Sequence, residues 1–244
     1  MANKKRPSVA DLRARVTEAD VVGIRSVRLN DMQDWKTRLM KVDQLYRGDW
    51  QEVFPDETVA TEYPHVMNLV QTEIDDIAKL VTEAIPTVSC PPDKEDPSSE
   101  AKAEIRNAIA DTYWEVNGGE TLVPRLAMDL VGAGCAFVAS YIDPDEDYPC
   151  FHRIDPRFAY PDVVNGRLQD LLVVEEVNWR KAARLFPELG LALDPTIRDR
   201  TIEVLHYYSK DVCMQAVSTA GPSGAASIYG TPRYWDPQGV LPVA

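Results

Sequence analysis

Apolar residues recur every three or four positions through the first half of the chain, which is the period of an amphipathic helix. The period is clearest from Asn30 onward, where we expect a helix that ends at Gly48, a residue suited to a left-handed helix terminus. A short helix is expected before it, from Ser8 to about Asp20, with Asp11 at the capping-box position. Three more helices are expected over residues 68–86, 98–117 and 121–133.

After Gly134 the pattern changes to short apolar or alternating runs, which are typical of β-strands. The Asn165–Gly166 pair is typical of a two-residue hairpin turn. Strands are expected within 135–142, 150–154, 171–177, 201–209 and 212–218, with a short helix over 179–186. Because consecutive strands joined by turns pair antiparallel, the predicted fold class is α+β: a helical amino-terminal half followed by an antiparallel sheet with a short helix.

The polar, proline-bounded segment "PPDKEDPSSE" at 91–100 is the best internal boundary. However, the apolar face of the helix before it is too large to leave in water, so we expect that helix to pack against the later helices or the sheet. The predicted organisation is an amino-terminal arm with a short helix over 1–29, one α+β domain over 30–220 and a loop over 221–244.

The composition is that of a globular protein, with 45% hydrophobic and 27% charged residues. A net charge of −13 argues against a protein that grips nucleic acid through its phosphates, because such binding needs a basic surface. The four cysteines form no CxxC pair, and no apolar run approaches the roughly 20 residues of a membrane span. Reduced thiols in a cytoplasm are therefore expected.

One acidic run resembles the start of a calcium-binding loop. Asp143, Asp145 and Asp147 alternate as the first three ligands of such a loop do. Tyr148 stands where the loop needs glycine, and Ile154 stands where a bidentate glutamate should close the site. A solvated acidic hairpin tip is the favoured interpretation.

The other candidate chemistry is also incomplete. Cys150 and His152 share a strand face but supply only half of a zinc site. The chain has no GxSxG or P-loop motif. The segment "IDPRFAYPD" instead predicts a strand that turns at Asp155–Pro156 and again at Pro161–Asp162. We therefore expect no catalytic residue, no cofactor and no metal site, and the chain is not expected to be an enzyme.

Five segments form an ordered series over about residues 35–210: "QLYRGDW", "PHVMNLVQTEIDDIAKLVTEAIPTV", "DLVGAGCAFVASYIDPDEDYPCFHRIDPRFAYPD", "LQDLLVVEEV" and "IEVLHYYSKD". This series resembles the amino-terminal half of tailed-bacteriophage portal proteins. Each motif alone is weak, and their order and spacing carry the resemblance. The portion matched is the wing domain of that family, in which long stem helices follow. Residues 221–244 would then be a loop leading toward a missing or truncated stem region.

The resemblance implies a homo-oligomeric ring, usually of twelve subunits, at one vertex of the capsid. Its implied partners are the major capsid protein, the terminase motor, a head-tail adaptor protein and double-stranded DNA, which passes through the channel without tight binding. The implied location is the virion, with assembly in the host cytoplasm. Two alternatives stay open: another head-tail adaptor of the virion, and a metal-dependent phage nuclease that uses the three aspartates at 143, 145 and 147.

Aromatic residues suggest one surface of such a ring. The five tryptophans are spread over helices, turns and loops, and aromatic residues outside a core favour interfaces. We expect the helix around 35–46 and the segment after it to form one subunit contact. The residues chosen are Trp35, Tyr46, Trp50 and Phe54.

Overall fold

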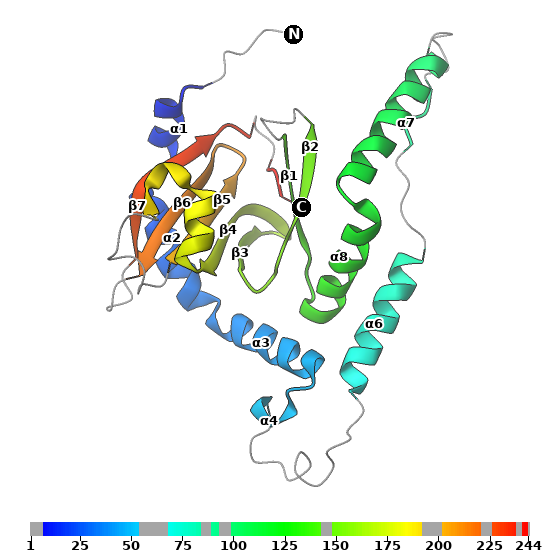
Figure 1. Ribbon diagram of the computed structural model, residues 1–244, viewed down its shortest axis with the longest axis horizontal. Coiled ribbons are helices and arrows are strands. Elements are labelled where there is room, and N and C mark those ends of the chain that lie inside the picture. Colours follow the sequence, from blue (N-terminus) through cyan, green and yellow to red (C-terminus); the bar gives the residue numbers. More distant parts are fainter. Residues whose placement is uncertain are drawn as a thin grey trace. The chain divides into compact units, whose positions relative to one another are not determined.

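The structure is a computed structural model of the whole chain. It describes residues 7–53, 68–83, 89–92, 99–142, 148–191, 202–220, 226–237 and 241–243 (Figure 1). The chain forms two compact units, which we call unit 1 (residues 1–36 and 157–244) and unit 2 (residues 37–156). Unit 2 is thus an insertion within unit 1, so the division falls at other positions than the predicted boundaries at 29/30 and 220/221.

Unit 1 contains a five-stranded antiparallel sheet in which every strand pairs with its neighbour in sequence. Its first hairpin turns at Asn165 and Gly166, whose φ angles of 52° and 71° are left-handed, as a type I′ turn requires. The strands are β3 (Ala159–Val164), β4 (Arg167–Val177), β5 (Ile202–Ser209), β6 (Cys213–Ala220) and β7 (Ala226–Trp235).

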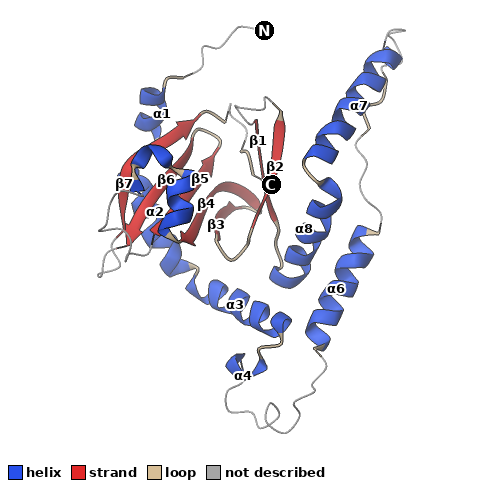
Figure 2. Ribbon diagram, in the orientation of Figure 1, coloured by secondary structure: helices blue, strands red, loops and turns tan. Residues whose placement is uncertain are grey.

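Helices cover both faces of this sheet (Figure 2). Side chains alternate along a strand, so Val204 and Leu205 of β5 point into two different apolar clusters. One cluster lies against α1 (Val9–Arg15) and α2 (Glu18–Asp31). The other lies against α9 (Trp179–Leu185) and the 3₁₀ turn η1 (Pro187–Leu189). The core of unit 1 therefore has two layers.

Polar contacts fix the start of the chain to the sheet. On α2, Arg25 is buried and forms a two-pronged ion pair with Glu203 of β5, in which Nε donates to Oε2 at 2.7 Å. Arg28 pairs with Asp170 of β4. Lys36 lies 3.9 Å from the centre of the Tyr160 ring and donates hydrogen bonds to backbone carbonyls at the start of β3. These contacts hold residues 25–36 to the sheet.

Unit 2 consists mainly of helices. The helix α3 (Gln33–Arg47) enters it from unit 1 and is ended by Gly48, whose φ is 82°. The remaining elements are α4 (Trp50–Val53), α6 (Leu69–Thr82), α7 (Ser99–Val116), α8 (Gly119–Ala133), β1 (Phe137–Ile142) and β2 (Pro149–Ile154). The helix α8 packs against α6, and β1 and β2 form a separate two-stranded antiparallel ribbon.

The predicted α+β fold class is confirmed: helices dominate the amino-terminal half, and antiparallel sheets with a short helix follow. The capping box of Ser8 and Asp11 is present. The first helix, however, ends at Arg15 rather than near Asp20, because Thr17 and Asp20 form a second capping box that starts α2. Sequence analysis missed α2 as a separate helix.

Three further predictions about the strands differ from the structure. The segment with Pro161 and Asp162 is not a turn but part of β3, an edge strand that tolerates proline because one side of an edge strand needs no hydrogen bond. The predicted loop over 221–244 contains β7, which has a bulge near Gly230 with a φ of 73°. The strands also form two sheets instead of one.

Within the described residues, none of the helices has the length and apolar character needed to cross a membrane.

Candidate subunit interface

Three of the four predicted interface residues lie in the described part of the chain, and each is half-buried. Trp35 is half-buried in the unit 1 part of α3, with the Lys36 ammonium 5.0 Å from the centre of its ring. Tyr46 and Trp50 are half-buried in unit 2. Phe54 lies outside the described residues. The structure therefore brings Tyr46 and Trp50 into one unit and leaves Trp35 in the other.

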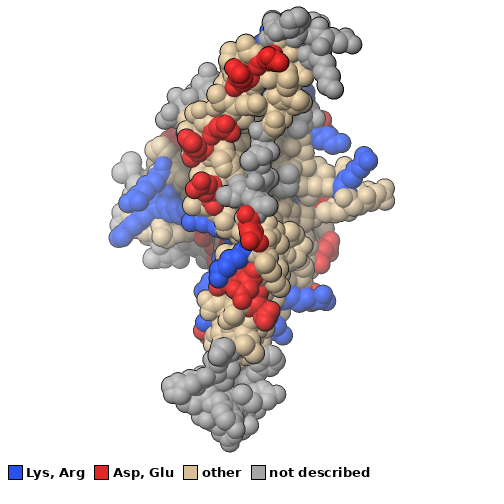
Figure 3. All heavy atoms as spheres, turned by 90° about the vertical axis from the view of Figure 1, so that its right-hand side faces the viewer, with Lys and Arg blue, Asp and Glu red and all other residues tan. Residues whose placement is uncertain are grey.

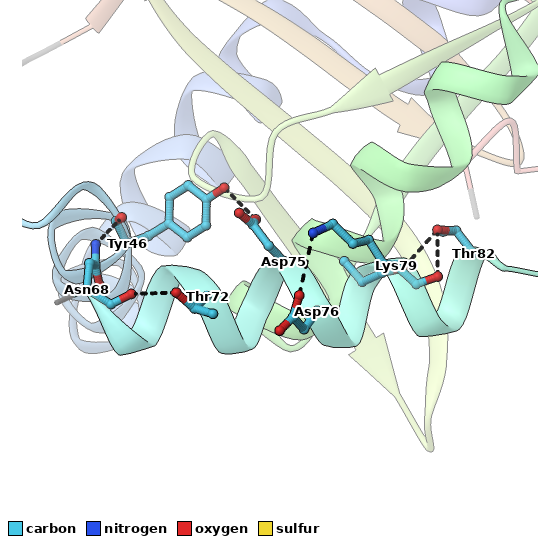
Figure 4. Close-up of polar contacts among 8 residues, drawn as sticks. Tyr46, Asn68, Thr72, Asp75, Asp76, Lys79 and Thr82 are labelled. Atoms are coloured by element: carbon cyan, nitrogen blue, oxygen red, sulfur yellow. Dashed lines mark hydrogen bonds and ion pairs between the residues drawn. The ribbon is translucent and has the colours of Figure 1, made fainter.

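Tyr46 takes part in a network that joins α3 to α6 within the chain (Figure 4). Its hydroxyl donates a hydrogen bond to Asp75 Oδ1 at 2.8 Å, and its carbonyl accepts one from Asn68 Nδ2 at 2.7 Å. Asn68 also caps α6, because its Oδ1 accepts a hydrogen bond from the backbone of Gln71 at 3.1 Å. Burial and the nearby carboxylate of Asp75 raise the pKa of Tyr46. Tyr46 therefore stabilises the contact between α3 and α6 within the chain.

The apolar face of α6 is wider than the part that the chain covers. Ala78 is buried, and Ile74 packs close to Gly132 of α8. At about 100° per residue, the remaining apolar side chains extend this face to roughly half of the helix circumference. These exposed side chains are Leu69, Ile77, Leu80 and Val81. Leu80 is the most exposed of the four, at 69%. The prediction that this helix packs against a later helix is confirmed for one edge of the face only.

The helix α7 carries a second exposed apolar stripe. Ile105, Ile109 and Val116 are separated by four and seven residues, so they lie on one side of the helix. Ile105 is 61% exposed. The buried residues of α7, Ser99 and Ala103, lie on the other side. This stripe has no covering element among the described residues.

The described residues of unit 2 form a small core. Among the described residues it has seven buried apolar side chains, of which four are alanines, whereas unit 1 has 21. It carries 12 of the 17 large apolar side chains that are exposed. Since burial of apolar area is the main driving force for folding, unit 2 has a surface suited to burial against another molecule.

The charge of the chain is also divided unequally. Unit 2 holds 24 Asp or Glu and 9 Lys or Arg, whereas unit 1 holds 15 and 17. The net charge of −13 thus combines −15 in unit 2 with +2 in unit 1. Figure 3 shows acidic side chains along the face that carries α6 and α7. The exposed carboxylates of α6, its C-cap and α7 are Glu73, Asp76, Glu83, Glu100, Glu104, Asp111 and Glu115.

The described residues contain no group of three or more His, Cys, Asp or Glu side chains arranged to hold a metal ion. Asp143, Asp145 and Asp147 lie outside those residues. His152 is exposed on β2, opposite Ala139 of β1.

Sequence reasoning selected aromatic residues for the predicted interface and did not single out the exposed aliphatic ones. The signal was present, because the apolar positions of 69–84 exceed what one neighbouring helix covers. The stripe on α7 is harder to see, since alanines and charges fill the positions between Ile105, Ile109 and Val116.

No protein-family model matches the chain, and none of the curated proteins matches it. Its function is therefore argued from the sequence resemblance and from the two units themselves.

Proposed function

We propose that this chain is a structural subunit of a phage portal ring, the channel at one capsid vertex through which DNA is packaged and ejected. In this role it contacts neighbouring copies, the major capsid protein, the terminase motor and a head-tail adaptor. The proposal rests on the ordered series of portal-like segments for the kind of assembly. The structure contributes an independent reason to expect an assembly.

The observation that carries the proposal is the incomplete burial of unit 2. The described residues of unit 2 bury few large apolar side chains, so they gain little stability from their own core. Exposed apolar faces on α6 and α7 would be covered if neighbouring copies packed around them. Subunits of obligate assemblies have interfaces of this apolar kind.

The acidic charge of unit 2 agrees with a channel protein. Specific and non-specific DNA binding both need cations that neutralise phosphates. A unit with a net charge of −15 repels the duplex, so DNA that passes close to it slides without being held.

Electron microscopy of the purified full chain tests the proposal. End-on views should show closed rings, and sedimentation should give one large species with a mass that is a whole multiple of 27.3 kDa. A monomer or a two-fold symmetric dimer at every concentration would overturn the portal assignment. Binding to a purified head or tail protein by the monomer would instead favour an adaptor of the virion.

A further inference from the structure

On α7, a row of carboxylates lies beside the exposed apolar stripe, and another helix of the same chain carries side chains of complementary chemistry. Glu104, Asp111 and Glu115 are separated by seven and four residues, so they form a row along one side of α7. The row lies one residue before the stripe of Ile105 and Val116, which corresponds to about 100° around the helix. An apolar stripe flanked by carboxylates is therefore presented along α7.

The complement is α9, which covers one face of the sheet in unit 1. Its exposed charged side chains are all cations: Arg180, Lys181 and Arg184. Lys181 contacts Glu175 of β4. The guanidinium of Arg180 lies 5.4 Å from the centre of the Trp179 ring. Leu185, 40% exposed, adds an apolar contact to the same short helix.

We propose that α9 of one copy receives α7 of the next copy, with Arg180 and Arg184 facing Asp111 and Glu115. The two arginines are four residues apart, as are the two carboxylates, so both pairs are spaced by about 6 Å along their helices. Leu185 then lies against the exposed isoleucines of α7. The inference rests on the proposed function in one respect: it places the contact between identical copies of the chain.

The unequal charge of the two units favours unit 1 of a second copy as the partner of α7. A two-fold contact between α7 faces would place two units of −15 against each other. A contact between unit 2 of one copy and unit 1 of the next joins opposite charges, at surfaces that differ on the two partners. Contacts between different surfaces repeat from copy to copy, and they close into a ring when the rotation allows it.

Charge reversal in two complementary variants tests the contact. In the full chain, Arg180→Glu with Arg184→Glu places carboxylates on both sides of the contact between α7 and α9. The second variant, Asp111→Lys with Glu115→Lys, places cations on both sides of the same contact. Each variant alone should assemble at least tenfold more weakly than the natural chain, as measured by mass photometry across a dilution series. An equal mixture should assemble again, because each interface between the two variants has opposite charges.

The mixed assembly should contain both variants in equal numbers by native mass spectrometry. The control matched to the arginine reversal is Arg167→Glu with Lys210→Glu, which makes the same change in net charge at exposed positions of unit 1 and should assemble normally. Circular dichroism melting of all variants confirms that the reversals leave the fold intact. Higher salt should weaken assembly of the natural chain through screening of this contact.

Failure of this inference is distinguishable from failure of the proposed function. If the natural chain forms rings that neither variant weakens, or if the mixture does not restore assembly, the contact is wrong and the portal proposal stands. If the variants restore each other but micrographs show open chains, the contact stands and the ring is wrong. A natural chain that is monomeric at every concentration overturns both.

Discussion

The ion pair of Arg25 and Glu203 joins two side chains that are 9% and 6% exposed. Removal of one partner leaves the other charge buried without compensation, which costs about 3–5 kcal/mol. We therefore expect Arg25→Ala to lower the free energy of unfolding by about that amount in urea denaturation. The double variant Arg25→Met with Glu203→Leu should lose much less, because no buried charge remains. Equal losses in the two variants would contradict this account.

Cys213 makes the stability of unit 1 sensitive to alkaline pH. Burial raises its pKa from 9.0 to about 12, so the folded state keeps the proton in a range where the unfolded chain releases it. The contribution is complete below pH 9 and is lost as the pH rises toward 12. The free energy of unfolding should fall between these values, by up to about 1.4 kcal/mol per pH unit from this thiol.

The variant Cys213→Ala should show a shallower decline over the same range, whereas Cys150→Ala, whose thiol is only half-buried, serves as the control. Tyr207 contributes in the same direction between pH 10 and about 12, because burial also raises its pKa. Identical slopes for the natural chain and Cys213→Ala would show that the thiol ionises equally in both states.

At the scale of elements, the start of α2 depends on its capping box. Thr17 accepts a hydrogen bond from the backbone of Asp20, and the Asp20 carboxylate accepts one from Thr17 in return. Loss of such a cap costs about 1 kcal/mol. Thr17→Ala should lower the free energy of unfolding by about this amount, and Thr17→Ser should retain most of it. If both variants lose the same amount, the hydroxyl is not the cause.

The exposed apolar side of α6 should matter for assembly and little for folding. Ile77→Ser with Leu80→Ser changes side chains that are 43% and 69% exposed, so the melting of an isolated subunit should change little. Assembly should weaken at least tenfold, equivalent to about 1.4 kcal/mol. The control is Val27→Ser, at an exposed apolar position of α2 in unit 1. A large loss of monomer stability would show that this face is already covered within the subunit.

Local signals predicted those elements whose cause is local. Gly48 and Asn68 mark helix ends in the sequence and do so in the structure. The strand β7 was not predictable in this way, because Gly230 and Pro232 interrupt it and both residue types are typical of loops. Its strand conformation depends on pairing with β6, and an added Cβ at Gly230 would come within 2.4 Å of the Leu189 side chain. Such a long-range packing requirement leaves no periodic pattern.

The candidate interface was likewise predictable only where its cause is local. The sequence shows that the helix over 69–84 has an excess of apolar residues, but only the structure shows which of them α8 covers. The proposed contact between α7 and α9 was inferred from which side chains are exposed on both helices, so it cannot be obtained from spacing alone. The hydrogen bond that joins the half-buried Tyr46 side chain to α6 depends on Asp75, which belongs to a different helix.

At the scale of the whole molecule, unit 2 should be the less stable part of an unassembled subunit. Its few buried side chains predict that its backbone amides open more easily than those of the sheet in unit 1. Hydrogen exchange on dilute monomer should therefore be fast in α6 and α7 and slow in β5 and β6. Assembly should slow exchange in α6 and α7. Equal protection of both units in the monomer would contradict the argument for an incomplete core.

The insertion of unit 2 within unit 1 also affects how the chain is made. Arg25 is synthesised 178 residues before Glu203, its ion-pair partner. At about 5–20 residues per second, α2 waits roughly 10–35 seconds for the strand that covers it. Unit 2 leaves the ribosome in the meantime, so α2 is translated before unit 2 but reaches its final contacts after it. A nascent chain halted before β5 therefore exposes the apolar side of α2, where chaperones that bind apolar segments are expected to act.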